Sequence, residues 1–303
     1  MILVSLIKNK NTIMSKMYIM VGLPGSGKTT KCEQILMEDG NAVRLNKDLT
    51  RKMLHFGKFS GRREGQTREA VRELAILFLK TSNVVIDDTN LNPRTMQGWK
   101  DLAKEENAKV EVIDMTDVPV EECVRRDAER QDSVGGTVIK NMALRYGLKQ
   151  FNPDSVVICD IDGTISDTTH RLHYVNVPEG QKKDWKGFFS EIENDPVRED
   201  VLRMLIEYYN EGKTIIFMSG RPEQYKEATL RWLAKYSLTF AYTLIMRRDG
   251  DKRPDTETKK ELFEQHFPDK SVIHVVLDDR PSIVKLWRDM ELNVIDVGKG
   301  ISF

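Results

Sequence analysis

A glycine-rich segment near the start of the sequence has the residue types that hold a polyphosphate. The octapeptide Gly22-Leu-Pro-Gly-Ser-Gly-Lys-Thr29 fits the pattern G-x-x-x-x-G-K-[ST] and follows an apolar run from Tyr18 to Val21. Glycines let backbone N–H groups turn inward around phosphates, the lysine can reach the β- and γ-phosphates, and the threonine hydroxyl can hold Mg²⁺. The segment predicts a nucleoside triphosphate site made by Gly22, Gly25, Ser26, Gly27, Lys28 and Thr29. The alternative is a glycine-rich turn that binds nothing.

A second set of polar residues suits an acceptor hydroxyl. Asn46 to Arg51 begin where the apolar run Ala42 to Leu45 ends, and in a parallel sheet this is where an acceptor-binding loop faces the phosphate loop. Asp48 could take the proton of an attacking hydroxyl, and Arg51 could hold an anionic group of the same acceptor. The alternative makes Asp48 a helix cap and Arg51 a solvated charge.

Two arginines, Arg126 and Arg130, have the spacing of neighbours on one helix face. They could close over the transferring phosphoryl group and neutralise the charge that develops there. Taken alone, such a pair is more typical of a solvated helix face.

In the second half of the chain, two carboxylates follow a buried run. Asp160-Ile-Asp162-Gly-Thr164 comes directly after Val156 to Cys159, and two side chains that are two residues apart at a strand end project to the same side. One carboxylate can attack phosphorus to give an aspartyl-phosphate, while the other protonates the leaving oxygen and then activates water. Gly163 permits the tight turn between them. The alternative is a capping or turn role for the same residues.

Three later features favour the catalytic interpretation of this motif. Ser219-Gly-Arg221 ends another apolar run and offers a hydroxyl and a backbone amide to a phosphate oxygen. Asp278-Asp279 ends a further run and can complete a Mg²⁺ site of oxygen ligands. Lys259 or its neighbour Lys260 lies between them in the sequence and could offset the charge of a phosphorylated aspartate.

The elements that must position these residues form two α/β domains. Short runs rich in valine and isoleucine alternate with helix-like stretches, which is typical of mainly parallel sheets flanked by helices. The polar segment with Asn152-Pro153 is a turn and marks the boundary, so we expect an N-terminal extension at 1–16 and domains at 17–150 and 151–303. The predicted strands are Tyr18 to Val21, Ala42 to Leu45, Val84 to Ile86, Val110 to Met115, Val156 to Cys159, Thr214 to Met218, Tyr242 to Met246, Val272 to Leu277 and Asn293 to Val297.

Composition restricts the class of protein. The 303 residues carry 47 Lys and Arg against 47 Asp and Glu, and 40% are hydrophobic, which is ordinary for a globular protein. Three distant cysteines without a C-x-x-C spacing suggest neither a disulfide framework nor a zinc site, and they fit a reducing, cytoplasmic compartment. No apolar run reaches the roughly 18 residues of a membrane span.

The zero net charge conceals a basic segment. Between Arg44 and Arg72 there are nine Lys or Arg and three Asp or Glu, an excess of six. Such an excess beside a phosphate-transfer site suits a polyanionic acceptor such as a nucleic acid strand. A charged helix face is the commoner explanation of such runs.

Taken together, these motifs resemble known families. The second-half set is similar to that of the haloacid-dehalogenase-like (HAD-like) phosphatases, and the first half resembles P-loop polynucleotide kinases. In this order and at this length, residues 17 to 303 resemble the bacteriophage type of polynucleotide kinase/3′-phosphatase. The resemblance implies a P-loop NTPase fold followed by a HAD-like Rossmannoid fold.

For the first half, the resemblance implies a kinase with ATP as phosphoryl donor and Mg²⁺ as cofactor. Lys28 and Thr29 would bind ATP and the metal, and Asp48 would be the general base toward a 5′-hydroxyl. The other implied roles are acceptor binding by Arg51 and Asp88 and contacts to the nucleotide phosphates by Arg126 and Arg130.

For the second half, the resemblance implies a 3′-phosphatase with Mg²⁺. Asp160 would be the nucleophile, Asp162 the general acid and base, and Lys259, which fits the phage spacing better than Lys260, the charge-neutralising lysine. The other implied roles are phosphate binding by Thr164, Ser219 and Arg221 and metal binding by Asp160, Asp162, Asp278 and Asp279. Residues 165–200 depart from the phage pattern, and we expect them to form a small cover over this site. His170 and His173 are expected to be cover or surface residues, not metal ligands.

We therefore predict an enzyme that heals RNA or DNA ends, adding a 5′-phosphate and removing a 3′-phosphate. Such an enzyme would need a separate nucleic acid ligase as its functional partner. We expect no association with membranes, and homo-oligomerisation is possible. The enzyme alternative is a small-metabolite kinase fused to a small-molecule phosphatase. A catalytically silent end-binding protein is the alternative from another class.

Overall fold

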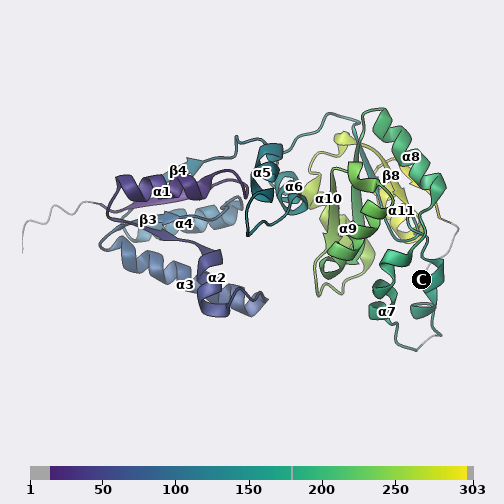
Figure 1. Cartoon of the computed structure of the whole chain (residues 1–303), viewed down its shortest axis with the longest axis horizontal. Coiled ribbons are helices and arrows are strands. Elements are labelled where there is room, and N and C mark those ends of the chain that lie inside the picture. Colours follow the sequence, from purple (N-terminus) through teal and green to yellow (C-terminus); the bar gives the residue numbers. More distant parts are fainter. Residues whose placement is uncertain (1–13, 179, 299–303) are drawn as a thin grey trace, which may run out of the picture. The chain divides into compact units, whose positions relative to one another are not determined.

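The computed structural model describes residues 14–178 and 180–298, and it has the α/β class that the sequence predicts (Figure 1). The chain divides into two compact units, one ending at Ile139 and the next beginning at Lys140. Helix α6 (Gly136–Arg145) spans this division, which lies before the boundary expected near residue 150. Of the extension proposed for residues 1–16, residues 1–13 lie outside the described residues, and Lys16 already belongs to the first strand. Among the described helices, none has both the length and the apolar character that a membrane span needs.

The first unit contains a parallel sheet of four strands in the order β2-β3-β1-β4. The strands are β1 (Lys16–Val21), β2 (Ala42–Leu45), β3 (Asn83–Ile86) and β4 (Lys109–Asp114), and their ends lie within two residues of the predictions. Because β1 and β3 are parallel neighbours, the residues that follow them emerge side by side at one edge of the sheet.

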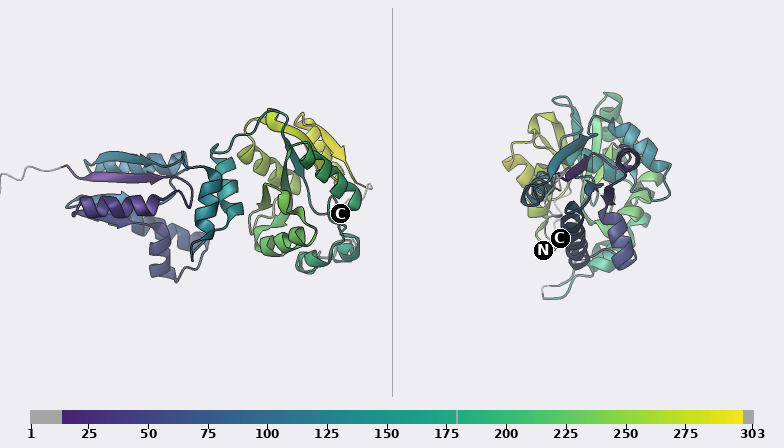
Figure 2. Two further views of the ribbon diagram at one scale, coloured as in Figure 1. Left: turned by 45° about the horizontal axis from the view of Figure 1, so that its top comes forward. Right: turned by 90° about the vertical axis from the view of Figure 1, so that its left-hand side faces the viewer.

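Helices cover both faces of this sheet (Figures 1 and 2). Helix α1 (Lys28–Glu38) packs on one face, and α3 (Gly61–Leu79) and α4 (Pro93–Glu105) pack on the other. Helix α4 begins at Pro93, because the Asn92 side chain accepts a hydrogen bond from the Arg94 N–H and proline suits the first helical position. The remaining helices of this unit are α2 (Lys47–His55) and α5 (Val120–Ala128), and the first residues of α6 also belong to it.

The second unit contains a parallel sheet of five strands in the order β7-β6-β5-β8-β9. The strands are β5 (Val156–Cys159), β6 (Thr214–Pro222), β7 (Thr243–Arg247), β8 (Ile273–Asp278) and β9 (Val294–Asp296). Strand β6 continues four residues beyond the predicted Met218, and its pairing with β7 is irregular between Ser219 and Pro222. This irregular end carries the predicted phosphate-binding residues.

Two helices cover each face of the second sheet. Helices α8 (Glu199–Asn210) and α9 (Lys226–Lys235) pack on one face, and α10 (Asp255–His266) and α11 (Pro281–Asp289) on the other. Short elements fill the segment between β5 and α8: η1 (Thr169–Tyr174), α7 (Trp185–Ser190) and η2 (Ile192–Asn194). Three other 3₁₀ turns are η3 (Glu223–Tyr225), η4 (Leu238–Phe240) and η5 (Lys270–Val272).

Candidate active sites of the two units

The glycine-rich segment of the first unit has the backbone that its sequence predicts. It connects β1 to α1, and Gly25 and Gly27 have φ angles of 81° and 95°. A Cβ atom on Gly25 would lie 2.2 Å from the carbonyl oxygen of Cys123 in α5, so this position requires glycine for its conformation and for its close approach. The loop leads into the N-terminus of α1, whose N–H groups and dipole favour an anion.

Lys28 is buried beneath this loop. Its Nζ donates hydrogen bonds to the Leu23 carbonyl oxygen at 2.6 Å and to Ser26 Oγ at 3.5 Å. Burial lowers the pKa of Lys28 to about 8, because the charged ammonium has lost much of its hydration. A bound polyphosphate would favour the charged form, so this lysine is suited to an anionic ligand.

Asp87, which sequence reasoning missed, lies beside Thr29. The residue follows β3, its side chain is buried, and its Oδ2 accepts hydrogen bonds from Thr29 Oγ1 at 3.3 Å and from Arg44 Nε at 2.8 Å. A P-loop hydroxyl and a strand-end aspartate are the oxygen donors that hold Mg²⁺ in P-loop enzymes. The apolar run Val84 to Ile86 ending in an acid was the sequence signal that could have identified it.

The expected acceptor loop is a helix. Residues 47–55 form α2, and its N-cap is Asn46, whose side chain accepts a hydrogen bond from the Leu49 N–H. The interpretation of Asp48 as the cap is therefore wrong, and Arg51 is not a solvated charge, since only 19% of its side chain is exposed. Arg51 NH1 donates to Asp48 Oδ1 at 2.6 Å, and Glu64 in α3 binds the other side of the guanidinium, with NH2 3.0 Å from its Oε2.

Asp88 lies at the start of the same helix. Its carboxylate accepts a hydrogen bond from the Lys47 N–H at 3.1 Å, and the Lys47 ammonium is 3.6 Å away. Burial raises the pKa of Asp88 above its ordinary value. Asp88 thus fixes the entry of α2, which carries Asp48 and Arg51.

Arg126 and Arg130 are held near the phosphate loop by different parts of the chain, the first by α5 and the second by the segment after it. Helix α5 ends at Ala128, so Arg130 lies beyond it and the predicted common helix face is wrong. Arg126 Nε donates to Glu122 at 2.6 Å, and its NH1 would lie 3.8 Å from a Cβ on Gly27. Arg130 pairs with Asp127 at 3.6 Å, and its charge acts together with burial to lower the pKa of Lys28.

In the second unit, the strand-end acids converge. One oxygen atom from each of Asp160, Asp278 and Asp279 lies within 4.8 Å of the others. Lys259 on α10 is buried, and its Nζ lies 3.0 Å from Asp160 Oδ1 and 2.8 Å from Asp278 Oδ2. The structure thus brings Lys259 to Asp160, the predicted nucleophile, whereas Lys260 pairs with Glu264 on the same helix.

The donor set of this cluster fits Mg²⁺, which prefers oxygen ligands. Burial, followed by the charge of Asp278, raises the pKa of Asp279 to about 6. Burial also raises the pKa of Asp160, and Asp278 and Asp279 add to this effect while Lys259 opposes it. A divalent cation would relieve this repulsion. Thr164 Oγ1 donates to Asp279 at 3.1 Å and thereby orients one of the three carboxylates.

Asp162 is not part of that cluster, although the sequence prediction assigned it to the metal as well. Its carboxylate accepts hydrogen bonds from Arg221 Nε at 2.9 Å and Arg221 NH2 at 2.7 Å, and from Arg171 NH2. Although burial acts in the other direction, Arg221 and Arg171 hold the pKa of Asp162 well below its usual range. Ser219 is fully buried, and its Oγ accepts a hydrogen bond from the Arg221 N–H at 3.2 Å.

Sequence reasoning missed Arg171 and Asp195. Arg171 lies between His170 and His173 in the expected cover, yet its side chain is fully buried and pairs with Asp195, with Nε 2.7 Å from Oδ1 and NH2 2.6 Å from Oδ2. Arg221 NH2 lies 3.3 Å from the same carboxylate. His170 lies 3.7 Å from Asp195, and neither histidine belongs to the acid cluster. The sequence offered no signal for this network, since a charged residue in a polar segment usually indicates surface.

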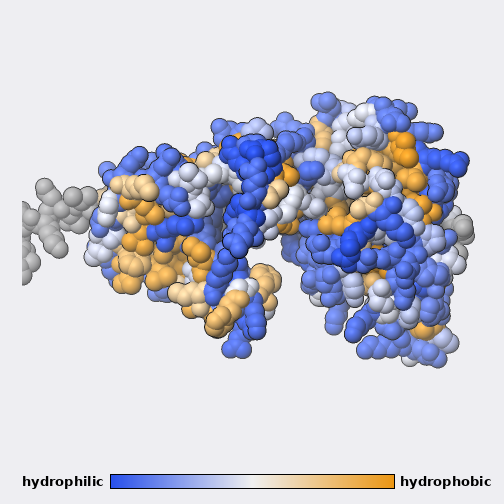
Figure 3. Space-filling model, viewed as in Figure 1, coloured by the Kyte–Doolittle hydropathy of each residue, from blue (hydrophilic) through white to orange (hydrophobic). Residues whose placement is uncertain are grey.

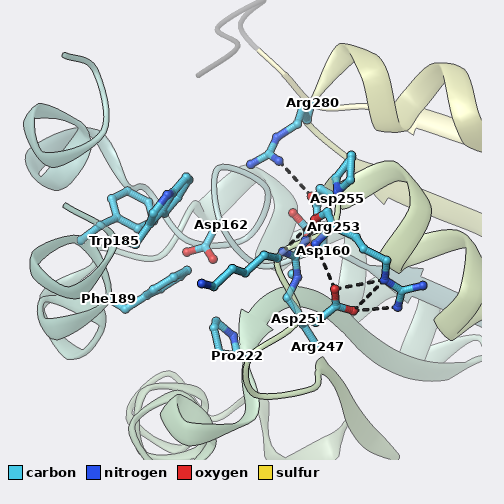
Figure 4. Close-up of a pocket in the computed structure, with 15 residues that line it drawn as sticks. Asp160, Asp162, Trp185, Phe189, Pro222, Arg247, Asp251, Arg253, Asp255 and Arg280 are labelled. Atoms are coloured by element: carbon cyan, nitrogen blue, oxygen red, sulfur yellow. Dashed lines mark hydrogen bonds and ion pairs between the residues drawn. The ribbon is translucent and has the colours of Figure 1, made fainter. Parts of the chain in front are cut away.

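A cavity of about 610 Å³ opens over these acids (Figure 4). Asp160 and Asp162 lie in it, and the residues that line its other sides come from α7, the end of β6 and the segment before α10. Trp185, Phe188 and Phe189 supply aromatic surface, and Arg247, Lys252, Arg253 and Arg280 supply positive charge. The residues predicted as a cover therefore include part of the wall of this cavity.

The surface near α2 combines charge with apolar side chains (Figure 3). Met53, Phe56 and Phe59 are strongly exposed there, within the segment that has an excess of six positive charges. The mixture of cations and exposed aromatic rings is typical of surfaces that bind single-stranded nucleic acid.

Comparisons with known proteins match both units. The family model described as the polynucleotide kinase PNKP phosphatase domain matches residues 154–301, and the model described as an AAA domain matches residues 17–149. A protein of Autographa californica nuclear polyhedrosis virus, described as a candidate bifunctional polynucleotide kinase/RNA ligase, is 27% identical over 304 residues. That match covers 92% of this chain and 42% of the viral protein, so the chain spans less than half the length of this relative.

Two solved structures of a Pnkp1/Rnl/Hen1 complex each contain a similar chain. In the one described as an RNA repair complex, the chain is 29% identical, with 97% of this chain and 99% of that chain covered and a TM-score of 0.41. In the other, the identity is 30%, the coverage is 97% and 100%, and the TM-score is 0.40.

Proposed function

Since this chain belongs to the polynucleotide kinase–phosphatase family, in which a P-loop domain precedes a HAD-type phosphatase domain, we propose that it heals the ends of broken nucleic acid strands. The first unit would transfer the γ-phosphate of ATP to a 5′-hydroxyl, and the second would remove a 3′-phosphate. The observation that carries this proposal is the presence of two separate phosphoryl-transfer constellations in one chain, one around Lys28 and one around Asp160.

In the kinase reaction, the P-loop and the N-terminus of α1 bind the phosphates of ATP, with Lys28 beneath them. The Mg²⁺ ion that Thr29 and Asp87 are placed to hold would neutralise charge on the transferring group. Asp48 takes the proton of the 5′-hydroxyl, and Arg51, which is held by Asp48 and Glu64, contacts a phosphate of the acceptor strand. Arg126 and Arg130 close on the nucleotide phosphates.

In the phosphatase reaction, an oxygen of Asp160 attacks phosphorus and the bond to the 3′-oxygen breaks. Asp162 gives its proton to that leaving oxygen, and it then takes a proton from the water that cleaves the aspartyl-phosphate. Asp278, Asp279 and Asp160 would hold Mg²⁺, which supplies positive charge to the phosphoryl oxygens. Lys259 offsets the charge on the nucleophile and on its phosphorylated form.

In the second site, the phosphate of a substrate must compete with Asp162 for Arg221 and Arg171. In the described state, Arg221 and Arg171 keep Asp162 in its charged form. An entering phosphate dianion attracts the same guanidinium groups and weakens their hold on Asp162, whose carboxylate then takes a proton from solvent and passes it to the leaving oxygen. Phosphate binding therefore favours the protonated form of Asp162, which is the form that a general acid needs.

The proposal is tested by following both ends of one oligonucleotide with a 5′-hydroxyl and a 3′-phosphate, as RNA and as DNA, with ATP and Mg²⁺. Lys28→Ala or Asp48→Asn should abolish phosphate transfer to the 5′ end and leave 3′-phosphate release intact, and Asp160→Asn should do the reverse. Asp101→Asn, at an exposed position on α4, is the matched control for the carboxylate changes. Phosphorylation of nucleosides or sugars in preference to oligonucleotides would refute the polynucleotide substrate.

The product ends, a 5′-phosphate and a 3′-hydroxyl, are the substrates of a ligase. We therefore propose that a separate ligase completes the repair and that RNA ends are the natural substrate. The support is the RNA ligase in the description of the viral relative and the RNA repair complex in that of the solved structure.

A further inference from the structure

The phosphatase cavity has an aromatic wall that the chemistry of phosphate release does not use. Trp185 and Phe189 of α7 line the same cavity as Asp160 and Asp162. Their rings are stacked, with centroids 5.9 Å apart and an angle of 23° between the planes. Figure 4 shows both rings on the side of the cavity opposite the catalytic acids. The Trp185 side chain is among the exposed large apolar groups of the described residues, with 42% of the residue accessible.

Contacts of Arg171 connect the helix that carries this wall to the catalytic site. Phe188 also borders the cavity, but its side chain is buried and lies under the Arg171 guanidinium, whose central carbon is 4.0 Å from the ring centroid. Arg171 NH1 also donates to the Phe188 carbonyl oxygen at 3.2 Å, and the same guanidinium holds Asp162. Asp184 caps α7 by accepting a hydrogen bond from the Gly187 N–H at 2.8 Å. Arg171 therefore connects α7, which carries the aromatic rings, to Asp162.

The size of the cavity also exceeds what a phosphate group requires. About 610 Å³ lies within the range of pockets that enclose whole small ligands. Tyr225 packs behind Phe189, with ring centroids 4.9 Å apart, so Trp185 is the ring with more surface left for a ligand. The Lys183 ammonium lies over this ring, 5.8 Å from its centroid, and a base would share the ring with it or displace it. A flat ring with an exposed face, opposite a phosphate-cleaving site, matches the geometry of a nucleotide whose base and phosphate bind at opposite ends.

We propose that Trp185 is a base-stacking subsite for the 3′-terminal nucleobase, which it holds while the 3′-phosphate lies at Asp160. This inference rests on the proposed 3′-phosphatase function and adds its substrate class: an unpaired terminal nucleotide of a single strand. Every base has a π face, so the subsite accepts all four bases and rejects phosphate esters that have no ring. A base paired in a duplex cannot turn onto the tryptophan without breaking its pair.

The test compares two single strands that differ only in whether the last nucleotide, which carries the 3′-phosphate, has its base. In the wild-type protein, the strand with the base should be cleaved with kcat/KM on the order of tenfold higher or more, as stacking on an aromatic side chain implies. Trp185→Ala should remove this preference by lowering kcat/KM for the normal strand alone. Trp185→Phe should retain most of it. Tyr209→Ala, at an exposed aromatic position on α8 outside the cavity, is the control and should change neither value.

Each outcome is informative. Equal activity of Trp185→Ala on the strand that lacks the base shows that the variant is folded and catalytically competent. An equal loss on both strands would assign Trp185 to the framework of the site and overturn the subsite, and so would unchanged kinetics on both. A wild-type protein that cleaves neither strand would refute the proposed function itself, and the subsite with it.

Discussion

Removal of Arg171 should destabilise the second unit, because it leaves buried charge without its partner. The guanidinium is fully buried and contacts Asp195 at 2.6 and 2.7 Å, Asp162, and the Phe188 carbonyl oxygen at 3.2 Å. Removing one partner of a buried ion pair costs roughly 3–5 kcal/mol. In Arg171→Met the free energy of unfolding should decrease by about 3 kcal/mol, near the lower end of that range, since Asp195 keeps Arg221 at 3.3 Å and Ser166 Oγ at 2.8 Å.

Denaturant unfolding can follow this unit alone. Three of the four tryptophans, at 185, 232 and 287, belong to it, so a Trp99→Phe background makes the fluorescence specific. Adding Asp195→Asn to Arg171→Met removes the charge left behind and should recover on the order of 1 kcal/mol, because residues in one network do not act additively. Arg231→Met, which removes an exposed pair with Glu193, is the control and should change little. The assignment of a buried ion-pair network is refuted if Arg171→Met unfolds like Arg231→Met. It is also refuted if the effects of Arg171→Met and Asp195→Asn on the free energy of unfolding are simply additive.

Two further predictions address the P-loop and the pH dependence of stability. Gly25→Ala should lower kinase activity roughly 10- to 100-fold through backbone strain and the 2.2 Å contact with Cys123, while 3′-phosphate release stays unchanged. Gly57→Ala is the control for backbone strain alone, since Gly57 has a φ of 75° and open space around it. Equal effects of the two substitutions would refute the packing argument. Burial lowers the pKa of His266 to about 4, below its unfolded value of 6.5, so the unfolded state binds more protons and stability falls as the pH drops from about 6.5 toward 4. The free energy of unfolding should decline by about 2 kcal/mol more between pH 7 and pH 5 in the wild type than in His266→Gln, and parallel curves would contradict this assignment.

The strands and the residues at their ends were accessible from the sequence because a parallel sheet imposes its own geometry. Apolar runs of valine and isoleucine mark the buried strands, and the carboxyl ends of parallel strands meet at one edge. Asp160 and Asp278 could therefore be expected to meet, although they are far apart in the sequence. Their contact with Lys259 in the structure follows from the same rule, since α10 packs directly on that sheet.

What the sequence could not show depends on burial and on competition between neighbouring residues. Asp87 and Asp88 are adjacent acids after one strand, and only the structure shows that the first faces Thr29 while the second holds the start of α2. Arg171 has the sequence context of a surface residue, and its role appears only when Asp195 and Phe188 fold around it. The segment after β2 was expected to be a loop, with Asp48 as a helix cap in the alternative, whereas the structure has the helix α2 there and Asn46 as its cap.

A chain that both adds and removes phosphate would only hydrolyse ATP if its two sites accepted the same position of one substrate, so selectivity is a condition of its usefulness. In the first unit, the candidate acceptor residues lie on α2, inserted after β2, while the phosphate loop follows β1. In the second unit, the aromatic wall lies on α7, inserted between β5 and α8, while the proposed reacting acids lie at the ends of β5 and β8. In both proposed sites, the reacting groups lie at the ends of β-strands, whereas the residues proposed to select the nucleic acid end lie on an inserted helix. Substitutions on α7 should therefore alter which 3′ ends are accepted and leave the 5′ preference unchanged, and substitutions on α2 should do the opposite.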